Sequence, residues 1–288
     1  MKRHPDQSVC PACGTAPGLW HEYPEGAIAL CRNCGLQWAR DVEDLPGVCR
    51  ALQDVNARYM SLDSFDWDDY PPYRDFFARL KSTASLRILD VGSGNGAFVQ
   101  YCLKRGHDVR GVEIDPGLKE AMPAEVAARI RFEPIEDVRD LGGPFDLATF
   151  WDVLEHLRDP MAVLESIAPA LAPGGRAFAR VNNSHDVFNL ASRTMLALAP
   201  PLGKAMLKVC FNLPQHRWNF RRKPMQAMLE RHGWRVEHFR PTETPAERLT
   251  ANPLARILIK TAYAANAMIG GGKIGEYHLS RPEEGKAP

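Results

Sequence analysis

The sequence lacks an excess of either charge and lacks any long apolar run. Its 288 residues include 36 Lys and Arg against 35 Asp and Glu. Proteins that grip nucleic-acid phosphates usually carry a basic excess, so this balance argues against a nucleic-acid substrate. The absence of a run long enough to cross a bilayer argues against a spanning helix, and no apolar segment follows the first residues as a signal peptide requires. We therefore expect a cytoplasmic protein with reduced thiols.

Cysteine is scarce and unevenly placed. Four of the seven cysteines form two C-x-x-C pairs, Cys10 with Cys13 and Cys31 with Cys34, each followed by glycine and separated by seventeen residues. That spacing is typical of a tetrahedral zinc site, whereas disulfides are disfavoured in a reduced compartment. A segment this short needs metal binding to fold. We predict a structural zinc ribbon in which the four thiolates close the coordination shell.

The sequence also lacks internal repeats and low-complexity tracts, and its length suits one large domain and a small one. We expect the ribbon over residues 1–45 and a linker with N-terminal helices over 46–84. The main domain is expected over 85–282, with a helical cap at 187–223 and an insert at 245–270.

A glycine-rich turn at the start of the main domain carries the most information. Residues 86–91 predict a buried parallel strand, and residues 97–105 have helical composition. Between them stand Gly92, Gly94 and Gly96. Glycines let a ligand approach the backbone, and the helix start offers it free N–H groups. The dinucleotide spacing G-x-G-x-x-G is not matched, and Asp90 would repel a pyrophosphate while suiting a ligand that carries an ammonium group.

Three further blocks follow this turn in order. Glu113 ends a second expected strand, where an acid can accept hydrogen bonds from ribose hydroxyls. The apolar run 145–151 then leads into D-V-L-E-H at residues 152–156. Finally, L-A-P-G-G at 171–175 precedes a strand expected over 177–181.

The four blocks resemble the motifs of class I S-adenosylmethionine (SAM)-dependent methyltransferases. With the cysteine pairs, they resemble a bacterial group of zinc-ribbon methyltransferases of the type 11/23 kind over about residues 8–282. The resemblance implies an α/β fold: a Rossmann-like, seven-stranded, mainly parallel sheet with an N-terminal zinc ribbon and a helical cap. It also implies a SAM site made by Asp90, Gly92, Gly94, Gly96, Glu113, Ile114, Ile135, Glu136, Trp151 and Asp152. Pro134 stands where the family usually has the adenine-binding Asp, so Ile135 and Glu136 are expected to supply that contact.

The resemblance implies transfer of a methyl group from SAM to an O or C atom of a small-molecule or glycan acceptor. Understood members of the group act on sugars, polyketides and other specialised metabolites. Two alternatives stay open: an RNA methyltransferase that uses the ribbon to bind its substrate, and a SAM-binding protein without catalysis. The near-neutral charge and the lack of an N-P-P-Y-type motif count against the RNA enzyme.

Three histidines are candidates for a general base that deprotonates the acceptor: His216, His156 and His185. We favour His216 because its segment, H-R-W-N-F, resembles the family's E-H-x-x-x-F motif near the acceptor pocket. Asp152, Glu155 and His156 also suggest a divalent metal site for a catechol-like acceptor. This segment resembles the acid-x-x-Glu-His segment of the ubiquinone-pathway O-methyltransferases. The interpretation that we favour has Asp152 touching SAM while Glu155 and His156 cap and pack the next helix.

Two apolar segments flank the expected acceptor site. Residues 187–213 predict two short helices divided by Pro200-Pro201, and residues 253–269 predict a further amphipathic helix. We favour a lid whose apolar faces pack on each other. The alternative is an apolar acceptor pocket, or peripheral contact with a membrane that holds a lipid-linked acceptor.

Overall fold

The computed structural model describes residues 9–16, 18, 20–42, 66–80, 84–135 and 140–281. Glu136, one of the predicted SAM contacts, lies outside these residues, as does most of the predicted linker.

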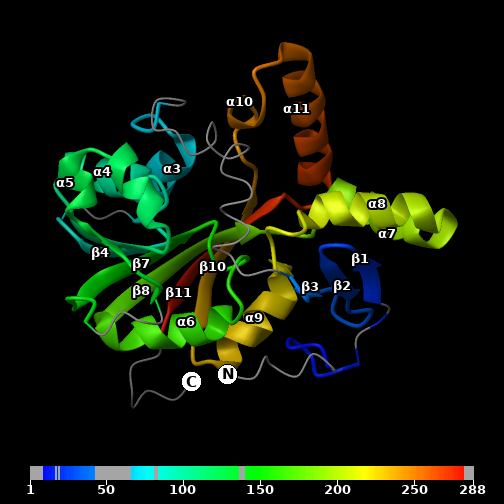
Figure 1. Cartoon of the computed structure of the whole chain (residues 1–288), viewed down its shortest axis with the longest axis horizontal. Helices are drawn as coiled ribbons and strands as arrows, with labels where there is room; N and C mark the ends of the chain where they lie inside the picture. The colour runs from blue at the N-terminus through cyan, green and yellow to red at the C-terminus, as the bar shows by residue number, and fades with distance from the viewer. Residues whose placement is uncertain are drawn as a thin grey trace.

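A seven-stranded sheet forms the centre of the main domain, as the sequence predicted (Figure 1). Its strands are β4 (Arg87–Val91), β5 (Asp108–Glu113), β6 (Ile130–Phe132), β7 (Phe145–Trp151), β8 (Leu171–Asn182), β10 (Arg235–Thr242) and β11 (Ile274–Ser280). They lie in the order β10-β11-β8-β7-β4-β5-β6, and the five neighbouring strands β8, β7, β4, β5 and β6 are parallel to one another. β11 runs antiparallel to β8, and β10 antiparallel to β11. The chain leaves β4 toward β5 and returns on its other side at β7, so the carboxyl ends of β4 and β7 form the switch point where α/β sheets bind ligands.

Helices cover both faces of this sheet (Figure 1). One face carries α3 (Pro71–Leu80), α4 (Ala97–Lys104) and α5 (Ala124–Ala127), and the other carries α6 (Pro160–Ile167) and α9 (Arg222–Arg231). Side chains alternate between faces along a strand. On β8, Ala177 and Ala179 therefore belong to the core under α6 and α9, while Phe178 belongs to the core under α3 and α4.

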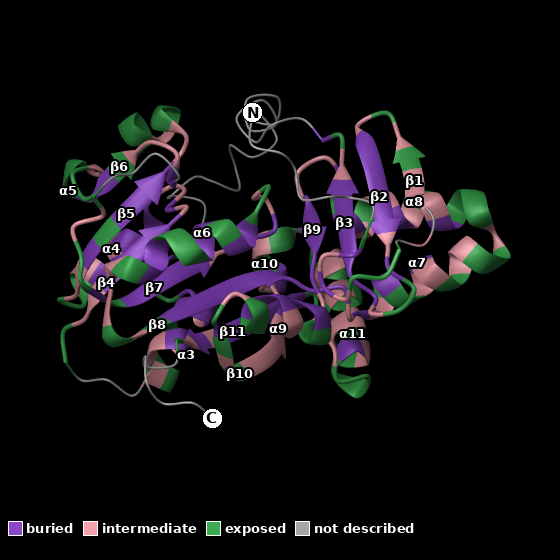
Figure 2. Ribbon diagram, turned by 90° about the horizontal axis from the view of Figure 1, so that it is seen from below, coloured by how far each residue is buried: buried purple, intermediate pink, exposed green. Residues whose placement is uncertain are grey.

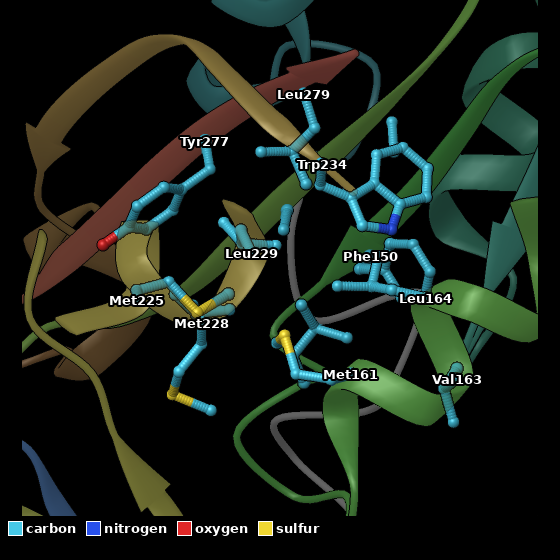
Figure 3. Close-up of a cluster of buried hydrophobic side chains, with 14 of the residues drawn as sticks. Phe150, Met161, Val163, Leu164, Met225, Met228, Leu229, Trp234, Tyr277 and Leu279 are labelled. Carbon is cyan, nitrogen blue, oxygen red and sulfur yellow. The ribbon is translucent and has the colours of Figure 1, made fainter. Parts of the chain in front are cut away.

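The core beneath α6 and α9 is built from large apolar side chains (Figure 3). Trp234 and Leu229 are 1% and 0% exposed and lie near Met161 of α6 and Leu279 of β11. In Figure 2 the inner strands β4, β7 and β11 are mostly buried, whereas no residue of the edge strand β10 is buried. Parallel strands covered on both faces read as continuous apolar runs, which is why the sequence revealed them.

β8 begins six residues earlier than the predicted start at residue 177. Leu171 pairs with Phe145, and the register then shifts before Arg176 pairs with Leu147. The P-G-G turn is therefore an irregularity within a long strand, and Gly174 accommodates it with a φ of 74°.

Four further helices follow β8 and β10: α7 (Val187–Leu198), α8 (Pro200–Phe211), α10 (Ala246–Leu249) and α11 (Pro253–Met268). The break between α7 and α8 falls at Pro200 as predicted, because proline is accommodated in the first turn of a helix and not within one. Figure 1 shows α7 and α8 lying over the N-terminal strands and α11 projecting away from the sheet. No helix among the described residues is long and apolar enough to cross a bilayer.

The cysteine-containing segment forms a second sheet. Its strands β1 (Trp20–Tyr23), β2 (Gly26–Leu30) and β3 (Gln37–Arg40) are antiparallel, and β9 (Trp218–Asn219) adds a fourth strand beside β3. β9 comes from the segment after α8, so two distant parts of the chain share one sheet. Ile28 and Ala39 of the small sheet also pack against Leu207 and Phe211 of α8.

A buried network of amides joins the small sheet to the cap. Gln37 of β3 donates to Asn189 Oδ1 of α7 at 3.2 Å, and Asn219 of β9 donates to Gln37 Oε1 at 2.8 Å. Asn189 in turn donates to Asp186 at 2.6 Å. All four residues are buried, so the loss of one member would remove hydrogen bonds from polar groups that water does not reach.

We expect Gln37→Leu to lower the free energy of unfolding by about 2–4 kcal/mol, because it removes one hydrogen bond from each of the buried amides of Asn189 and Asn219. Gln226→Leu is the matched control, since Gln226 makes an exposed hydrogen bond with Glu230; its effect should stay within about 0.5 kcal/mol. Urea denaturation of both variants measures the difference. Equal stability of the two would contradict the role given to the network.

Candidate functional site

The glycine turn follows β4 at the switch point. Gly92, Gly94 and Gly96 have φ angles of 74°, 54° and 76°, a region that residues with a Cβ rarely adopt. A Cβ on Gly92 would lie 2.5 Å from Val153 Cγ2. The turn therefore packs closely on the segment that follows β7, and only glycine fits there.

Glu113 holds the turn from the end of β5. Its Oε2 accepts a hydrogen bond from the Gly94 N–H at 2.7 Å, and its Oε1 accepts one from the Asp115 N–H at 3.0 Å. Each carboxylate oxygen can accept a second hydrogen bond, which leaves capacity for ligand hydroxyls. Burial raises the pKa of Glu113 above its ordinary value. The two backbone N–H donors oppose this effect of burial by stabilising the deprotonated form of Glu113, and ligand hydroxyls would stabilise that form further.

Asp90, at the end of β4, is 1% exposed. Its carboxylate accepts a hydrogen bond from the Thr149 hydroxyl of β7 at 2.8 Å. Burial raises the pKa of Asp90 to about 7. A carboxyl group in this position favours a cation nearby, because a cation would stabilise its ionised form.

The other predicted SAM contacts lie around the same edge. Trp151 packs among aromatic rings, with its centroid 4.7 Å from Tyr73 and 5.0 Å from Phe98. Ile114 is half-buried beside Glu113, and Ile135 is buried. The glycine turn, the strand-end acid Glu113 and the aromatic rings around Trp151 together fit a ligand with a ribose, an amine and an aromatic base.

Asp152 forms an ion pair with Arg180 that the sequence did not predict. Its φ is 57°, and its carboxylate accepts hydrogen bonds from Arg180, a buried residue of β8. Arg180 also donates to the Thr244 hydroxyl at 3.2 Å. The negative charge of Asp152 is therefore balanced within the protein.

A second group of titratable side chains lies just beyond Asp152. Glu155, His156 and His216 each present a ligand atom within 4.8 Å of the others. Asp152 is not in this group, and residues 154–156 form a turn before α6 and not a helix. The arrangement therefore differs from the Asp152, Glu155 and His156 set that the sequence suggested for a metal.

Glu155 is the buried acid of this group. Its Oε1 accepts a hydrogen bond from the Asn182 N–H at 3.0 Å, while its Oε2 is buried without a partner among the described residues. Burial, with a contribution from the charge of Asp152, raises the pKa of Glu155 to about 8. This carboxyl group is neutral at pH 7 and has one oxygen left for another donor or acceptor.

The two histidines differ in the partners of their ring nitrogens. His156 Nδ1 lies 2.8 Å from the Gln215 carbonyl, which can only accept, so Nδ1 carries the proton and the Nε2 lone pair is available. Asn182 Nδ2 donates to the Trp218 carbonyl at 2.9 Å and contacts His216 Nδ1 at 3.0 Å. The Nδ1 atom of His216 therefore accepts from Asn182, and its Nε2 atom lies 3.3 Å from the side-chain nitrogen of Asn212. Burial lowers the pKa of both histidines, and His156 lowers that of His216 further.

The small sheet is tied directly to this group. The N–H groups of Arg217 and Trp218 donate to the Glu155 carbonyl at 2.7 and 3.1 Å. The Arg217 carbonyl accepts a hydrogen bond from the Ala39 N–H of β3 at 2.8 Å. The backbone that follows His216 is thus held between the small sheet and the loop that carries Glu155.

His185 lies apart from Glu155 and His156. Its Nε2 is 3.2 Å from the Ile269 carbonyl, and its Nδ1 is 3.1 Å from an Arg221 guanidinium nitrogen. Both ring nitrogens therefore have partners that join the ends of β8, α11 and β9.

The four predicted metal ligands come together at one end of the small sheet. Cys10 Sγ and Cys34 Sγ are 3.6 Å apart, as are Cys13 Sγ and Cys31 Sγ, and all four sulfurs lie within 4.8 Å of one another. A tetrahedral zinc ion with Zn–S bonds of about 2.3 Å requires sulfurs about 3.8 Å apart. The donor set fits zinc in number, chemistry and size.

Sequence reasoning missed Arg180 and Asn182 as members of the site. The strand was expected to end at residue 181, but it extends to Asn182. For Arg180, the apolar residues around it in the sequence do not indicate which acid pairs with a buried arginine. Asn182 could have been found, since it stands in the Asn-Asn pair at the position where the resembling family often has Pro-Asn.

The glycine turn and the strand-end acid lie at the switch point, where α/β sheets bind nucleotide-like ligands. A family model described as a methyltransferase domain matches residues 49–239, and the chain belongs to this family. Membership supports the binding of SAM. The matched residues exclude the cysteine pairs.

Two curated relatives are ubiquinone biosynthesis O-methyltransferases. The protein from Xylella fastidiosa (strain M23) is 28% identical over 159 residues, covering 47% of this chain and 65% of the relative. The one from Xanthomonas campestris pv. campestris (strain B100) is 30% identical over 128 residues, covering 42% of this chain and 54% of the relative. The chain thus spans less than two thirds of the length of either relative.

Solved structures share the fold at low identity. A Burkholderia thailandensis 1,6-didemethyltoxoflavin-N1-methyltransferase, solved with S-adenosylhomocysteine, has a TM-score of 0.51 at 18% identity and covers 92% of this chain and 100% of its own. A [4+2]-cyclase also has a TM-score of 0.51, at 12% identity, covering 83% of this chain and 96% of its own. Because a cyclase shares the fold, the fold alone does not establish the reaction.

The raised pKa of Asp90 predicts a pH-dependent stability. The folded-state pKa of about 7 exceeds the ordinary value of 3.8, so the folded protein binds more protons between these values and loses stability as pH rises through them. Between pH 5 and pH 8 this group should lower the free energy of unfolding by about 2–3 kcal/mol. Asp90→Asn should remove that part of the pH dependence in urea denaturation without ligand. An unchanged slope in the variant would contradict the assignment.

Proposed function

We propose that the protein is a SAM-dependent methyltransferase that methylates a hydroxyl oxygen of a small-molecule or glycan acceptor, with His156 as the general base. The observation that carries this proposal is the adjacency of two sites. The glycine turn touches Val153, and the group of Glu155, His156 and His216 follows directly in the chain. Donor and acceptor would therefore meet at the carboxyl ends of β4 and β7.

SAM, when bound, supplies a methyl group activated by its sulfonium. The residues proposed to hold it are those of the glycine turn, with Glu113 toward the ribose and the buried charge of Asp90 favouring the positive ligand. The chain then needs to align the acceptor and to accept the hydroxyl proton.

His156 suits proton acceptance better than His216, which the sequence favoured. The Gln215 carbonyl holds the proton of His156 on Nδ1, which leaves the Nε2 lone pair for the acceptor hydroxyl. The lowered pKa keeps the imidazole neutral at pH 7. The Nδ1 atom of His216 already accepts a hydrogen bond from Asn182. His216 is therefore proposed to orient the substrate that receives the methyl group. O-methylation is also the reaction named for the ubiquinone-biosynthesis relatives.

The test is His156→Asn, in which the amide N–H can keep the hydrogen bond to the Gln215 carbonyl while Nε2 is lost. We expect kcat to fall by about 10²-fold or more, with the Kd for SAM within about twofold of wild type. S-adenosylhomocysteine release with catechols and nucleotide-linked sugars as acceptors measures kcat, and calorimetry measures SAM binding.

His216→Asn is the matched control and should lower kcat less than tenfold, since it keeps an acceptor for Asn182. Full activity in His156→Asn would refute the assignment of the base. Binding of SAM without turnover of any acceptor would favour the non-catalytic alternative.

We also propose that Cys10, Cys13, Cys31 and Cys34 hold a structural zinc ion. A closed set of four thiolates leaves no position for a substrate, so the ion would act through the fold. Through β3 and β9 it would stabilise the backbone that follows His216.

Cys31→Ser should abolish zinc binding and lower the thermal midpoint by at least about 5 °C, because structural zinc sites contribute folding free energy. Metal analysis of the purified protein should give one zinc per chain for wild type. Cys210→Ser, which changes a half-buried cysteine of α8 outside the cluster, should keep the metal. Wild-type protein without zinc, and of the same stability as Cys31→Ser, would remove the ribbon proposal.

A further inference from the structure

The exposed apolar side chains of this protein are gathered in one region. Among the described residues, every large apolar side chain that is exposed, except Val9, lies in the inserted helices or at their ends. We call these the apolar surface: Phe188, Leu190, Leu198, Leu202 and Val209 on α7 and α8, and Leu249, Leu254, Ile257, Leu258, Met268 and Ile269 on or beside α10 and α11. Scattered apolar residues are normal on a protein surface, but such a concentration indicates an interaction site.

Each helix group has its other face occupied. On α11, the Tyr263 hydroxyl donates to the Thr244 carbonyl and Asn266 donates to Glu243, each at 2.7 Å. The outward side chains Leu254, Ile257 and Leu258 are 71%, 61% and 72% exposed and follow helical spacing.

The α7–α8 pair repeats this arrangement. Leu207 and Phe211 face the small sheet, where they pack on Ile28. Leu198 and Val209 are 73% and 78% exposed. In Figure 1 the small sheet lies on one side of α7 and α8 while α11 rises on the other. The inserted helices are therefore amphipathic, and their second apolar faces are not covered by any part of the chain that the structure describes.

The charge of the same segments identifies the partner. Residues 187–229 contain seven Lys and Arg and no Asp or Glu, and residues 248–275 contain four Lys and Arg and no Asp or Glu. This is unusual in a chain whose charges otherwise balance. Lys273 is exposed, and its ammonium lies 5.6 Å from the Phe188 ring centroid, where the two helix groups meet. Lys260 of α11 is 61% exposed and pairs with Glu247 of α10.

We propose that the apolar surface docks on a membrane that contains anionic phospholipids. Leucine, isoleucine, methionine and phenylalanine would enter the interfacial layer, and the lysines would meet lipid phosphates. A symmetric contact between two copies would instead bring together two surfaces that each have an excess of basic side chains. The proposal concerns where the protein acts and does not depend on the proposed reaction.

Vesicle sedimentation of the full-length protein tests this. We expect binding to vesicles of phosphatidylcholine with about one-third phosphatidylglycerol, weaker binding to phosphatidylcholine alone, and release by high salt. The combined variant Leu254→Ser, Ile257→Ser and Leu258→Ser should lower the partition coefficient at least about tenfold. Val9→Ser, an exposed apolar change elsewhere, should bind as wild type does.

Lys260→Glu with Lys273→Glu provides an independent variant that keeps the apolar residues. It should also lose binding to anionic vesicles about tenfold, while Arg235→Glu on β10 should not. Failure of wild type to bind anionic vesicles, or unchanged binding in both surface variants, would overturn the proposal. So would a concentration-dependent dimer in gel filtration that the leucine variant dissociates while vesicle binding is absent.

Discussion

The antiparallel contact of β9 with β3 is the constraint on which the acceptor side of this protein depends. β9 is only two residues long, yet its backbone neighbourhood serves two partners at once. Arg217 and Trp218 give their N–H groups to the Glu155 carbonyl, and the Arg217 carbonyl accepts from Ala39 of β3. Because backbone groups are obligatory hydrogen-bonding partners, neither side can move without leaving buried groups unsatisfied. The cysteine-bearing sheet is thereby coupled to the proposed base at His156.

Buried carboxyl groups are the second organising feature. Asp90, Glu113 and Glu155 all lie at or near the carboxyl edge of the parallel strands, and burial raises the pKa of each. The neighbouring Asp152 carboxylate is paired with the guanidinium of Arg180, which balances its charge. A site built from acids with raised pKa values favours a positively charged ligand, which would lower those pKa values and gain binding energy from doing so. This electrostatic character agrees with the sulfonium and ammonium of SAM.

Local patterns predicted most of the main sheet correctly. Buried parallel strands are continuous apolar runs, so β4, β5 and β7 could be located by composition, and Pro200 placed the break between α7 and α8. The start of β8 was less well located, since a P-G-G turn looks like a boundary even when strand pairing continues across it. The cysteine spacing predicted the cluster, because the two cysteines of a C-x-x-C turn lie close enough to bind the same metal ion.

The sequence by itself determined the family, the glycine turn and its companion acids, and the grouping of the four cysteines. The glycine turn and each C-x-x-C pair are encoded within a few neighbouring residues, and the order of the motifs along the chain indicates the family. Only the tertiary structure decided that β9 joins the small sheet, that Arg180 neutralises Asp152, and that His156 and not His216 has an available lone pair. Those outcomes depend on hydrogen bonds between residues far apart in the chain, such as Gln215 with His156 and Asn182 with Trp218. Tautomers and buried ion pairs follow from the partner that folding supplies, and one sequence without its fold does not name that partner.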